Sequence, residues 1–144
     1  MMASNNYLGL TTHPAVVEAA RKALEKYGVG AGSVPLLGGT LDLHRELEHK
    51  LAQMKGCEDA VIFSSGYASN VGCVSALVRK NDVAINDRLN HASIIDGCRL
   101  SGGTFRTFRH NDLTHLEKVL RSTEDQGFLG KLVIVDGVFS MDGD

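Results

Sequence analysis

The chain has 144 residues, of which 43% are hydrophobic and 22% are charged, and its net charge is −2. This composition is ordinary for a folded globular protein and gives no electrostatic reason to expect nucleic acid or an anionic membrane as a partner. No apolar run approaches the roughly 20 residues needed to cross a bilayer, and the first ten residues are unlike a signal peptide, so no membrane segment is expected.

Two helices are predicted before residue 59. The first covers residues 14–28, with Thr12 as its N-cap. A loop dense in glycine, residues 28–40, leads to a second helix over 41–56 that Thr40 can cap. The glycines of this loop are explained either by backbone that lies close to a ligand or to another chain, or by a simple flexible linker.

From residue 59 the pattern changes to short apolar runs that alternate with helical periodicity. The predicted elements are strand 59–66, helix 67–80, strand 82–87, helix 91–103, strand 104–110, helix 111–123 (with Asn111 or Asp112 as cap) and strand 131–139. Strands separated by helices pair in parallel through right-handed crossovers. We therefore predict an α/β fold with a mostly parallel sheet and helices on both faces, and a division of the chain into domains 1–58 and 59–144.

Polar and glycine-rich residues follow the carboxyl ends of all four predicted strands. They read SSGYASN after the first strand, NDRLNHAS after the second, RHND after the third and DGVFSMDGD after the fourth. Ligands of open α/β sheets bind beyond these strand ends. The sequence thus predicts one ligand site on this rim of the sheet.

The stretch FSSGYASN, residues 63–70, predicts a strand, a turn of small residues and then a helix. Small side chains let an anion reach the N–H groups of the helix N-terminus, so a phosphate is the expected occupant. The stretch is neither a Walker A loop nor a dinucleotide fingerprint, because it contains no Gly-Lys-Ser/Thr and no G-x-G-x-x-G. An ordinary tight turn explains the same residues equally well.

His91 follows the second predicted strand on the same rim. A histidine there can stack its flat ring on a flat ligand, donate a hydrogen bond or move a proton. The alternative is that His91 only caps the helix that follows or bonds a neighbouring carbonyl.

The cysteines and histidines give no indication of a metal site. The three cysteines, Cys57, Cys73 and Cys98, are odd in number and widely spaced. This pattern argues against a disulfide framework or a zinc site and suits a reducing compartment. The six histidines form no pair of the H-E-x-x-H type. We expect no bound metal and a cytoplasmic location.

Six stretches of the chain together resemble one family. In chain order they are SNNYLGL, YGVGAGSVPLLGGTLDLHRELEHKLA, FSSGYASNVG, NDRLNHASIIDGCRLS, FRHNDLTHLEKVL and VDGVFSMDGD. They follow the order seen in the α-oxoamine synthases, pyridoxal 5'-phosphate (PLP) enzymes of the aspartate aminotransferase fold, fold type I. The resemblance covers essentially the whole chain and looks closest to the glycine C-acetyltransferase (2-amino-3-ketobutyrate CoA ligase) branch.

The resemblance implies roles for five residues. Gly66 and Tyr67 would hold the phosphate of the cofactor. His91 would stack on the pyridine ring and touch the substrate, which makes it the implied catalytic residue. Ser140 would lie against the cofactor. Asn6 resembles the residue that reaches the site of the partner subunit, because members of the family are homodimers with shared sites.

The implied reaction is the PLP-dependent condensation of an amino acid with an acyl-CoA thioester, which would make the full-length protein an acyltransferase. Glycine with acetyl-CoA is the first expectation for the substrates. Alanine with a pimeloyl thioester, as in 8-amino-7-oxononanoate synthase, is the second, and a serine palmitoyltransferase-like member is a further alternative. Pro35 stands where some relatives carry an arginine, which leaves the contacts to substrate or CoA open.

Several motifs of the family have no counterpart in this chain. They are the aspartate that pairs with the ring nitrogen, the D-x-A/S-H histidine and the T-x-S-K-type lysine that forms the Schiff base. We therefore expect an N-terminal fragment in which residues 59–144 are the first part of the PLP-binding large domain. By itself the chain is expected to be inactive and to expose its last strand as an open apolar edge.

Two alternatives of other classes stay open. The first is a non-catalytic partner subunit that lacks the lysine and supports an active relative. The second is a simple nucleotide- or phosphate-binding α/β module. Co-purification with a full-length relative would indicate the first, and nucleotide binding without PLP would indicate the second.

Overall fold

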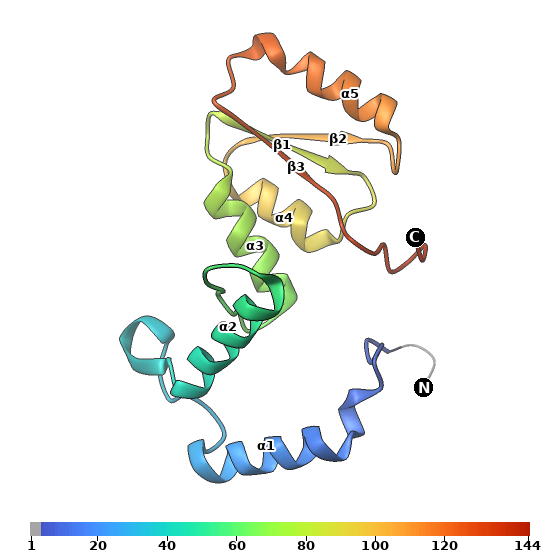
Figure 1. Cartoon of the computed structure of the whole chain (residues 1–144). Coiled ribbons are helices and arrows are strands. Elements are labelled where there is room, and N and C mark those ends of the chain that lie inside the picture. Colours follow the sequence, from blue (N-terminus) through green and yellow to red (C-terminus); the bar gives the residue numbers. More distant parts are fainter. Residues whose placement is uncertain (1–3) are drawn as a thin grey trace. The chain divides into compact units, whose positions relative to one another are not determined.

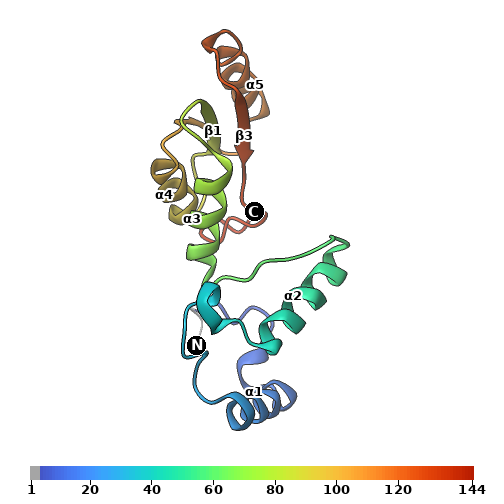
Figure 2. The same cartoon turned by 90° about the vertical axis from the view of Figure 1, so that its left-hand side faces the viewer.

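A computed structural model describes residues 4–144 (Figures 1 and 2). The chain divides into two compact units, of which the first ends at Val61 and the second covers Ile62–Asp144. This division falls three residues after the predicted domain boundary between residues 58 and 59. The assignment of the two parts as domains stays a prediction.

In the first unit, helix α1 covers Pro14–Tyr27. Its N-cap is His13 and not the predicted Thr12, because Thr12 is the last residue of a 3₁₀ turn that precedes the helix. Pro14 is the first helical residue, where its missing N–H costs no intrahelical hydrogen bond. The sequence therefore predicted the helix and placed its cap one residue too early.

Helix α2 covers Asp42–Lys55, and its N-cap is Leu41, not the predicted Thr40. The ring Nδ1 of His44 accepts the N–H of Leu41 at 2.9 Å, which satisfies a backbone donor at the start of the helix. The hydroxyl of Thr40 instead donates to the carbonyl of Pro35 at 3.2 Å. A side chain used in this way by the preceding loop is not available to the helix.

The glycine-dense loop contains a single π turn over Pro35–Gly39. Gly38 has a φ of 151°, and Gly39 is buried. A Cβ on Gly39 would lie 1.9 Å from the carbonyl oxygen of Ser33, so only glycine fits there. Gly39 therefore lets the backbone of its own loop approach closely.

The second unit contains three α-helices and three strands in alternating order among the residues described, with a 3₁₀ turn, Glu124–Gln126, between the last helix and the last strand. The helices and strands are α3 (Gly66–Leu77), β1 (Asp82–Asp87), α4 (Ala92–Leu100), β2 (Thr104–Phe108), α5 (Leu113–Ser122) and β3 (Gly130–Ile134). The strand order is β2-β1-β3, and β1 is parallel to both neighbours. Ala84 of β1 pairs with Phe105 of β2 and with Leu132 of β3. The predicted parallel sheet is confirmed.

Residues 59–66 do not form the strand that their apolar run predicted. From Asp59 to Phe63 the backbone has no regular secondary structure, and α3 begins at Gly66. A strand exists only where the backbone pairs with a neighbour. Within the described part of the chain the sheet has three strands, β2, β1 and β3, and residues 59–66 are not one of them.

Helices cover both faces of the sheet, as the sequence predicted (Figure 1). On one face, Ala84 of β1 packs in a cluster with buried residues of α4 and of the end of α3, namely Val74, Val78, Ile94 and Cys98. On the other face, Val83 and Ile85 pack with Phe108 and with the apolar side of α5. Figure 2 shows α3 and α4 packed side by side on their face. Alternation along β1 thus supplies both cores.

Each helix of the second unit begins at a polar cap. The Ser65 hydroxyl accepts the N–H of Ala68 before α3, and the Asp112 carboxylate accepts the N–H of His115 before α5. Asp112, and not the alternative Asn111, is therefore the cap of α5. Among the residues that the structure describes, no helix is both long and apolar enough to span a membrane.

Candidate functional site

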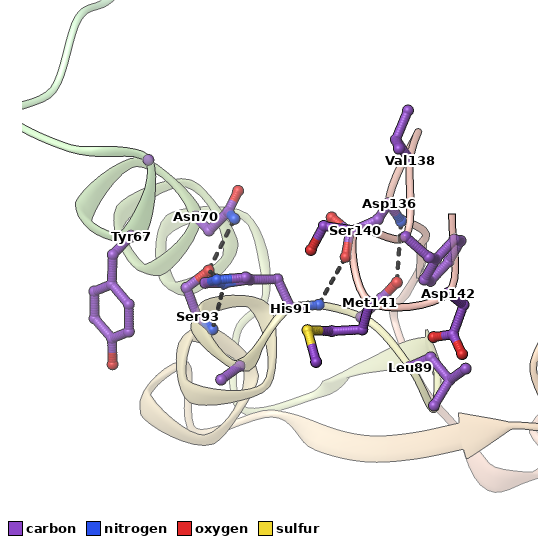
Figure 3. A pocket seen from close by; sticks show the side chains of 14 residues that line it. Tyr67, Asn70, Leu89, His91, Ser93, Asp136, Val138, Ser140, Met141 and Asp142 are labelled. Atoms are coloured by element: carbon purple, nitrogen blue, oxygen red, sulfur yellow. Dashed lines mark hydrogen bonds between the residues drawn. The ribbon is translucent and has the colours of Figure 1, made fainter. Parts of the chain in front are cut away.

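A cavity of about 470 Å³ opens at the carboxyl ends of β1 and β3 (Figure 3). Three segments line it: the first turn of α3, residues 89–93 after β1, and residues 136–142 after β3. The chain leaves β1 through α4 toward β2, while β3 lies on the opposite side of β1. A crevice at such a switch in strand order is where ligands of open α/β sheets bind. Three of the four polar stretches predicted for the rim line this cavity, whereas RHND, residues 109–112, contributes no residue to it.

The first turn of α3 presents free backbone donors to this cavity. The first N–H groups of a helix have no acceptor within the helix. Ser65 takes the N–H of Ala68 at 3.1 Å, whereas the N–H groups of Gly66 and Tyr67 have no partner among residues 4–144. Gly66 and Tyr67 line the cavity, and a Cβ on Gly66 would meet no atom within 4 Å. The turn is open to an anion.

The Tyr67 side chain connects the two helices that frame the cavity. Its hydroxyl donates to Oδ2 of Asp96 in α4 at 2.7 Å. This hydrogen bond to a carboxylate raises the pKa of Tyr67 above its ordinary value of 10.0. The phenol therefore stays a neutral donor to Asp96, and the part of Tyr67 suited to an anion is its backbone N–H.

His91 both caps a helix and lines the cavity. It is the N-cap of α4, and its ring Nδ1 accepts the N–H of Ser93 at 3.2 Å. The capping role that the sequence left open is thus confirmed. The same side chain belongs to the cavity wall, so the cap holds the ring at the edge of the site (Figure 3).

A clamp that the sequence reasoning missed joins the two loops of the site. The Asp136 carboxylate accepts the backbone N–H of His91 at 2.7 Å, and the Asn90 side-chain oxygen accepts the N–H of Asp136 at 3.0 Å. The Asn90 amide also donates to the carbonyl of Ile134 at 2.8 Å and to the side chain of Asn86 at 3.0 Å. Asn90 is buried, and these bonds satisfy it fully.

The clamp also explains why β3 ends at Ile134, five residues before its predicted end. The Asn90 side chain takes the carbonyl of Ile134 and the N–H of Asp136, groups that a neighbouring strand would otherwise bond. The signal for Asn90 was present in the sequence, since it directly precedes His91 in NDRLNHAS. An asparagine at a strand end often bonds nearby backbone, but its partners here are 44 and 46 positions away.

Of the other two predicted site residues, Ser140 lines the cavity and Asn6 belongs to the other compact unit. Ser140 lines the cavity from the turn after β3, together with Val138 and Met141. Asn6 belongs to the first compact unit, where its side-chain oxygen accepts the N–H of Thr11 at 3.3 Å. The cavity residues thus include Gly66, Tyr67, His91 and Ser140, while the role of Asn6 toward a partner subunit stays a prediction.

Comparison with known proteins places this chain in a family. The family model for aminotransferase class I and II matches residues 1–144. The 8-amino-7-oxononanoate synthase of Geobacter sulfurreducens is 51% identical over 144 residues, which are 100% of this chain and 36% of that protein. The enzyme of the same name from Thermoanaerobacter pseudethanolicus is 51% identical over 143 residues, 99% of this chain and 36% of the relative.

Solved structures agree with the sequence relatives. The serine palmitoyltransferase of Sphingomonas wittichii has a TM-score of 0.91 and 41% identity over 96% of this chain and 34% of its own. That of S. paucimobilis, solved with bound PLP and myriocin, has a TM-score of 0.91 and 40% identity over the same shares. The 8-amino-7-oxononanoate synthase of Francisella tularensis has a TM-score of 0.70 and 31% identity over 81% and 32%. The chain spans about a third of the length of these proteins.

Proposed function

Because this chain belongs to the aminotransferase class I and II family, within its α-oxoamine synthase group, we propose that the full-length protein is a PLP-dependent acyltransferase. It condenses an amino acid with an acyl-CoA thioester. The observation that carries the proposal is the cavity at the ends of β1 and β3, which combines free helix N–H groups with the edge of a histidine ring. When bound, PLP supplies the electron sink for the carbon of the amino acid that loses its proton.

The residues of the cavity fit the two halves of this cofactor. The N–H groups of Gly66 and Tyr67 are donors for the phosphate, and the open space beside Gly66 lets it approach the backbone. The ring of His91 is a flat apolar wall with a polar edge, which suits stacking on a pyridine ring. Ser140 contacts the cofactor or substrate from the turn after β3.

The clamp of Asn90 and Asp136 supports these roles. It fixes the backbone of His91 to the segment that carries Ser140, so both sides of the cavity are held together. A cofactor that must stay in one plane during a reaction benefits from walls that do not move relative to each other. The chain therefore contributes binding and orientation at one side of the site.

The curated relatives favour one branch of the group for the substrates. Both relatives described above are named 8-amino-7-oxononanoate synthase, the second expectation from the sequence. We therefore propose alanine and a pimeloyl thioester as the first substrate pair to test. Glycine with acetyl-CoA, the first expectation from the motifs, is the second pair, and serine with palmitoyl-CoA is the third.

The proposal is tested on the full-length protein. We expect the purified protein to carry PLP, seen as its absorbance, and to release free CoA from one acyl-CoA only when the matching amino acid is present. His91→Ala should lower this release at least tenfold, because the ring wall is lost. Ser75→Ala, which removes a hydroxyl bonded within α3 to the carbonyl of Val71, is the control and should leave the rate unchanged.

Two results would overturn the proposal. Absence of PLP from the purified protein would exclude the cofactor. PLP binding without CoA release from any of the three pairs would instead favour the non-catalytic subunit.

We also propose a homodimer in the cytoplasm for the full-length protein. The three cysteines of the chain are free, which is compatible with a reducing compartment. The α-oxoamine synthases that the chain resembles are homodimers with shared sites, which supports the dimer. Light scattering on the full-length protein should give twice the mass of one chain, and a monomeric mass would contradict the assignment.

A further inference from the structure

Three side chains form a hydrogen-bonded chain that ends on the ring of His91. The amide nitrogen of Asn70 in α3 donates to the hydroxyl oxygen of Ser93 at 2.9 Å. That hydroxyl oxygen lies 2.6 Å from Nδ1 of His91 (Figure 3). Ser93 is fully buried in the first turn of α4, so no water competes for its hydroxyl. Among the described residues, the Ser93 hydroxyl therefore bonds only the Asn70 amide on one side and the His91 ring on the other.

The direction of each proton in this chain follows from the donors. The Ser93 backbone N–H can only donate, and it points at Nδ1 from 3.2 Å, so Nδ1 is an acceptor. The Asn70 amide donates a hydrogen bond to the hydroxyl oxygen of Ser93. The Ser93 hydroxyl proton is therefore directed to Nδ1 of His91 as well. Both interactions require Nδ1 to carry no proton.

A neutral imidazole has one N–H, so the proton must lie on Nε2. Nε2 has no hydrogen-bond partner among the described residues, and His91 is an exposed part of the cavity wall. We propose that Asn70 and Ser93 are positioning residues that fix the tautomer of His91, so that Nε2 is the N–H donor offered to an acceptor oxygen of the cavity's occupant. Only the identity of that occupant rests on the proposed function.

This hydrogen-bonded series of side chains predicts effects of different size for two small substitutions. Asn70→Asp keeps the size of the side chain but replaces its donor by an acceptor, so the Ser93 hydroxyl turns to the carboxylate. The lone pairs of the Ser93 hydroxyl oxygen then face Nδ1 of His91 and favour a proton on that nitrogen. Ser93→Ala removes the hydroxyl but leaves the Ser93 N–H, which still favours an unprotonated Nδ1. Asn70→Asp should therefore change the tautomer more than Ser93→Ala.

The experiment reads the ring nitrogens of His91 by NMR in full-length, cofactor-free protein labelled with ¹⁵N-histidine. Spectra are recorded above about pH 8, where histidine is ordinarily neutral, and the His91 signals are assigned by their loss in His91→Gln. We expect an unprotonated Nδ1 in the parent. Asn70→Asp should raise the Nδ1–H population about fivefold, the effect of one hydrogen bond of ordinary strength. Ser75→Ala, the matched loss of a hydroxyl in α3, should change nothing.

A protonated Nδ1 in the parent would overturn the inference. So would an Asn70→Asp variant that is folded by circular dichroism and keeps the parent's tautomer. If Asn70→Asp fails to fold, the smaller change of tautomer expected in Ser93→Ala is the test. An unchanged tautomer in that variant would then overturn the inference. Because these spectra need no PLP, they are independent of the cofactor absorbance and CoA release that test the proposed function.

Discussion

His110 lies between two carboxylates at the end of β2. Its Nδ1 is 3.0 Å from Asp87 and its Nε2 is 2.9 Å from Asp144, and the side chain is 18% exposed. Hydrogen bonds to Asp144 and then to Asp87 raise the pKa of His110 above its ordinary value of 6.5. Burial acts to raise the pKa of Asp87, but N–H groups of Leu89 and Asn111, with His110, outweigh it and lower that pKa. The charged pair is favoured in the folded state.

These shifts predict how stability depends on pH. A raised folded pKa means that the stabilisation from His110 is complete below its ordinary value of 6.5 and is lost as pH rises through the raised pKa. The lowered pKa of Asp87 means that its contribution is present above 3.8 and is lost as pH falls. The free energy of unfolding, measured with urea, should therefore fall as pH rises above about 6.5.

His110→Gln should remove this loss above about pH 6.5, because an amide does not titrate there. His49→Gln is the matched control, since the His49 side chain bonds only Gln53, one turn further along α2, among residues 4–144. An unchanged slope in His110→Gln would contradict the assignment.

A second prediction at the residue scale concerns the crossing of α3 and α4. A Cβ on Gly97 would lie 3.0 Å from Cβ of Val74 and 3.1 Å from the carbonyl oxygen of Asn70. Alanine gains about 1 kcal/mol of helix propensity over glycine, but overpacking costs about 1–3 kcal/mol. We expect Gly97→Ala to lower the free energy of unfolding, measured with urea. Gly30→Ala, with nothing within 4 Å, should be neutral or slightly stabilising.

At the scale of elements, β1 is the centre of the second unit. It has a strand on each side and helices on both faces, and five of its six residues are buried. A central strand has a continuous run of buried residues, whereas buried and exposed residues alternate along an edge strand. β3 shows that alternation, with Val133 41% exposed. Stability is therefore concentrated in β1.

Two truncations compare these strands. Ile85→Ala in β1 should cost about 2–5 kcal/mol of unfolding free energy, because the side chain is fully buried and leaves a cavity. Val133→Ala in β3 should cost clearly less, because part of its surface is already in water. Urea unfolding of both variants measures the difference, and equal losses would show that β3 is covered in the full-length protein.

At the scale of the whole molecule, the described sheet has an apolar edge. β3 pairs with β1 on one side only, and its neighbourhood includes Leu129 and Val135, which are 82% and 57% exposed. Unpaired backbone with apolar side chains is a template for pairing with another chain. The edge that the sequence predicted is thus present in residues 4–144.

We expect the 144-residue chain, expressed by itself, to associate through this edge and to release no CoA from any acyl-CoA and amino acid. Size-exclusion chromatography should show assemblies above the monomer, and Val133→Lys should reduce them, because a charge on an edge opposes strand pairing. Monomeric behaviour of the parent chain would contradict the role of the edge. Activity of the chain alone would contradict the need for the absent lysine motif.

The sequence by itself determined the local elements and their class. Apolar runs and helical periodicity depend on residues close in the chain, so they predicted α1 to α5, β1 to β3, the parallel sheet and the polar rim. The motifs around Gly66, His91 and Ser140 predicted the family, and these three residues do line one cavity. The caps of α1 and α2 were each predicted one residue too early, because Thr12 belongs to the 3₁₀ turn before α1 and the Thr40 hydroxyl donates to Pro35.

The tertiary structure decided what depends on distant partners. Whether residues 59–66 form a strand depends on a neighbour to pair with, and periodicity cannot supply one. The clamp between Asn90 and Asp136 joins residues 46 positions apart, and the bond from Asn70 to Ser93 spans 23. Only the packing of α3 on α4 and of β3 beside β1 brings these groups within hydrogen-bond distance. The residues that orient His91 therefore became visible only in the folded chain.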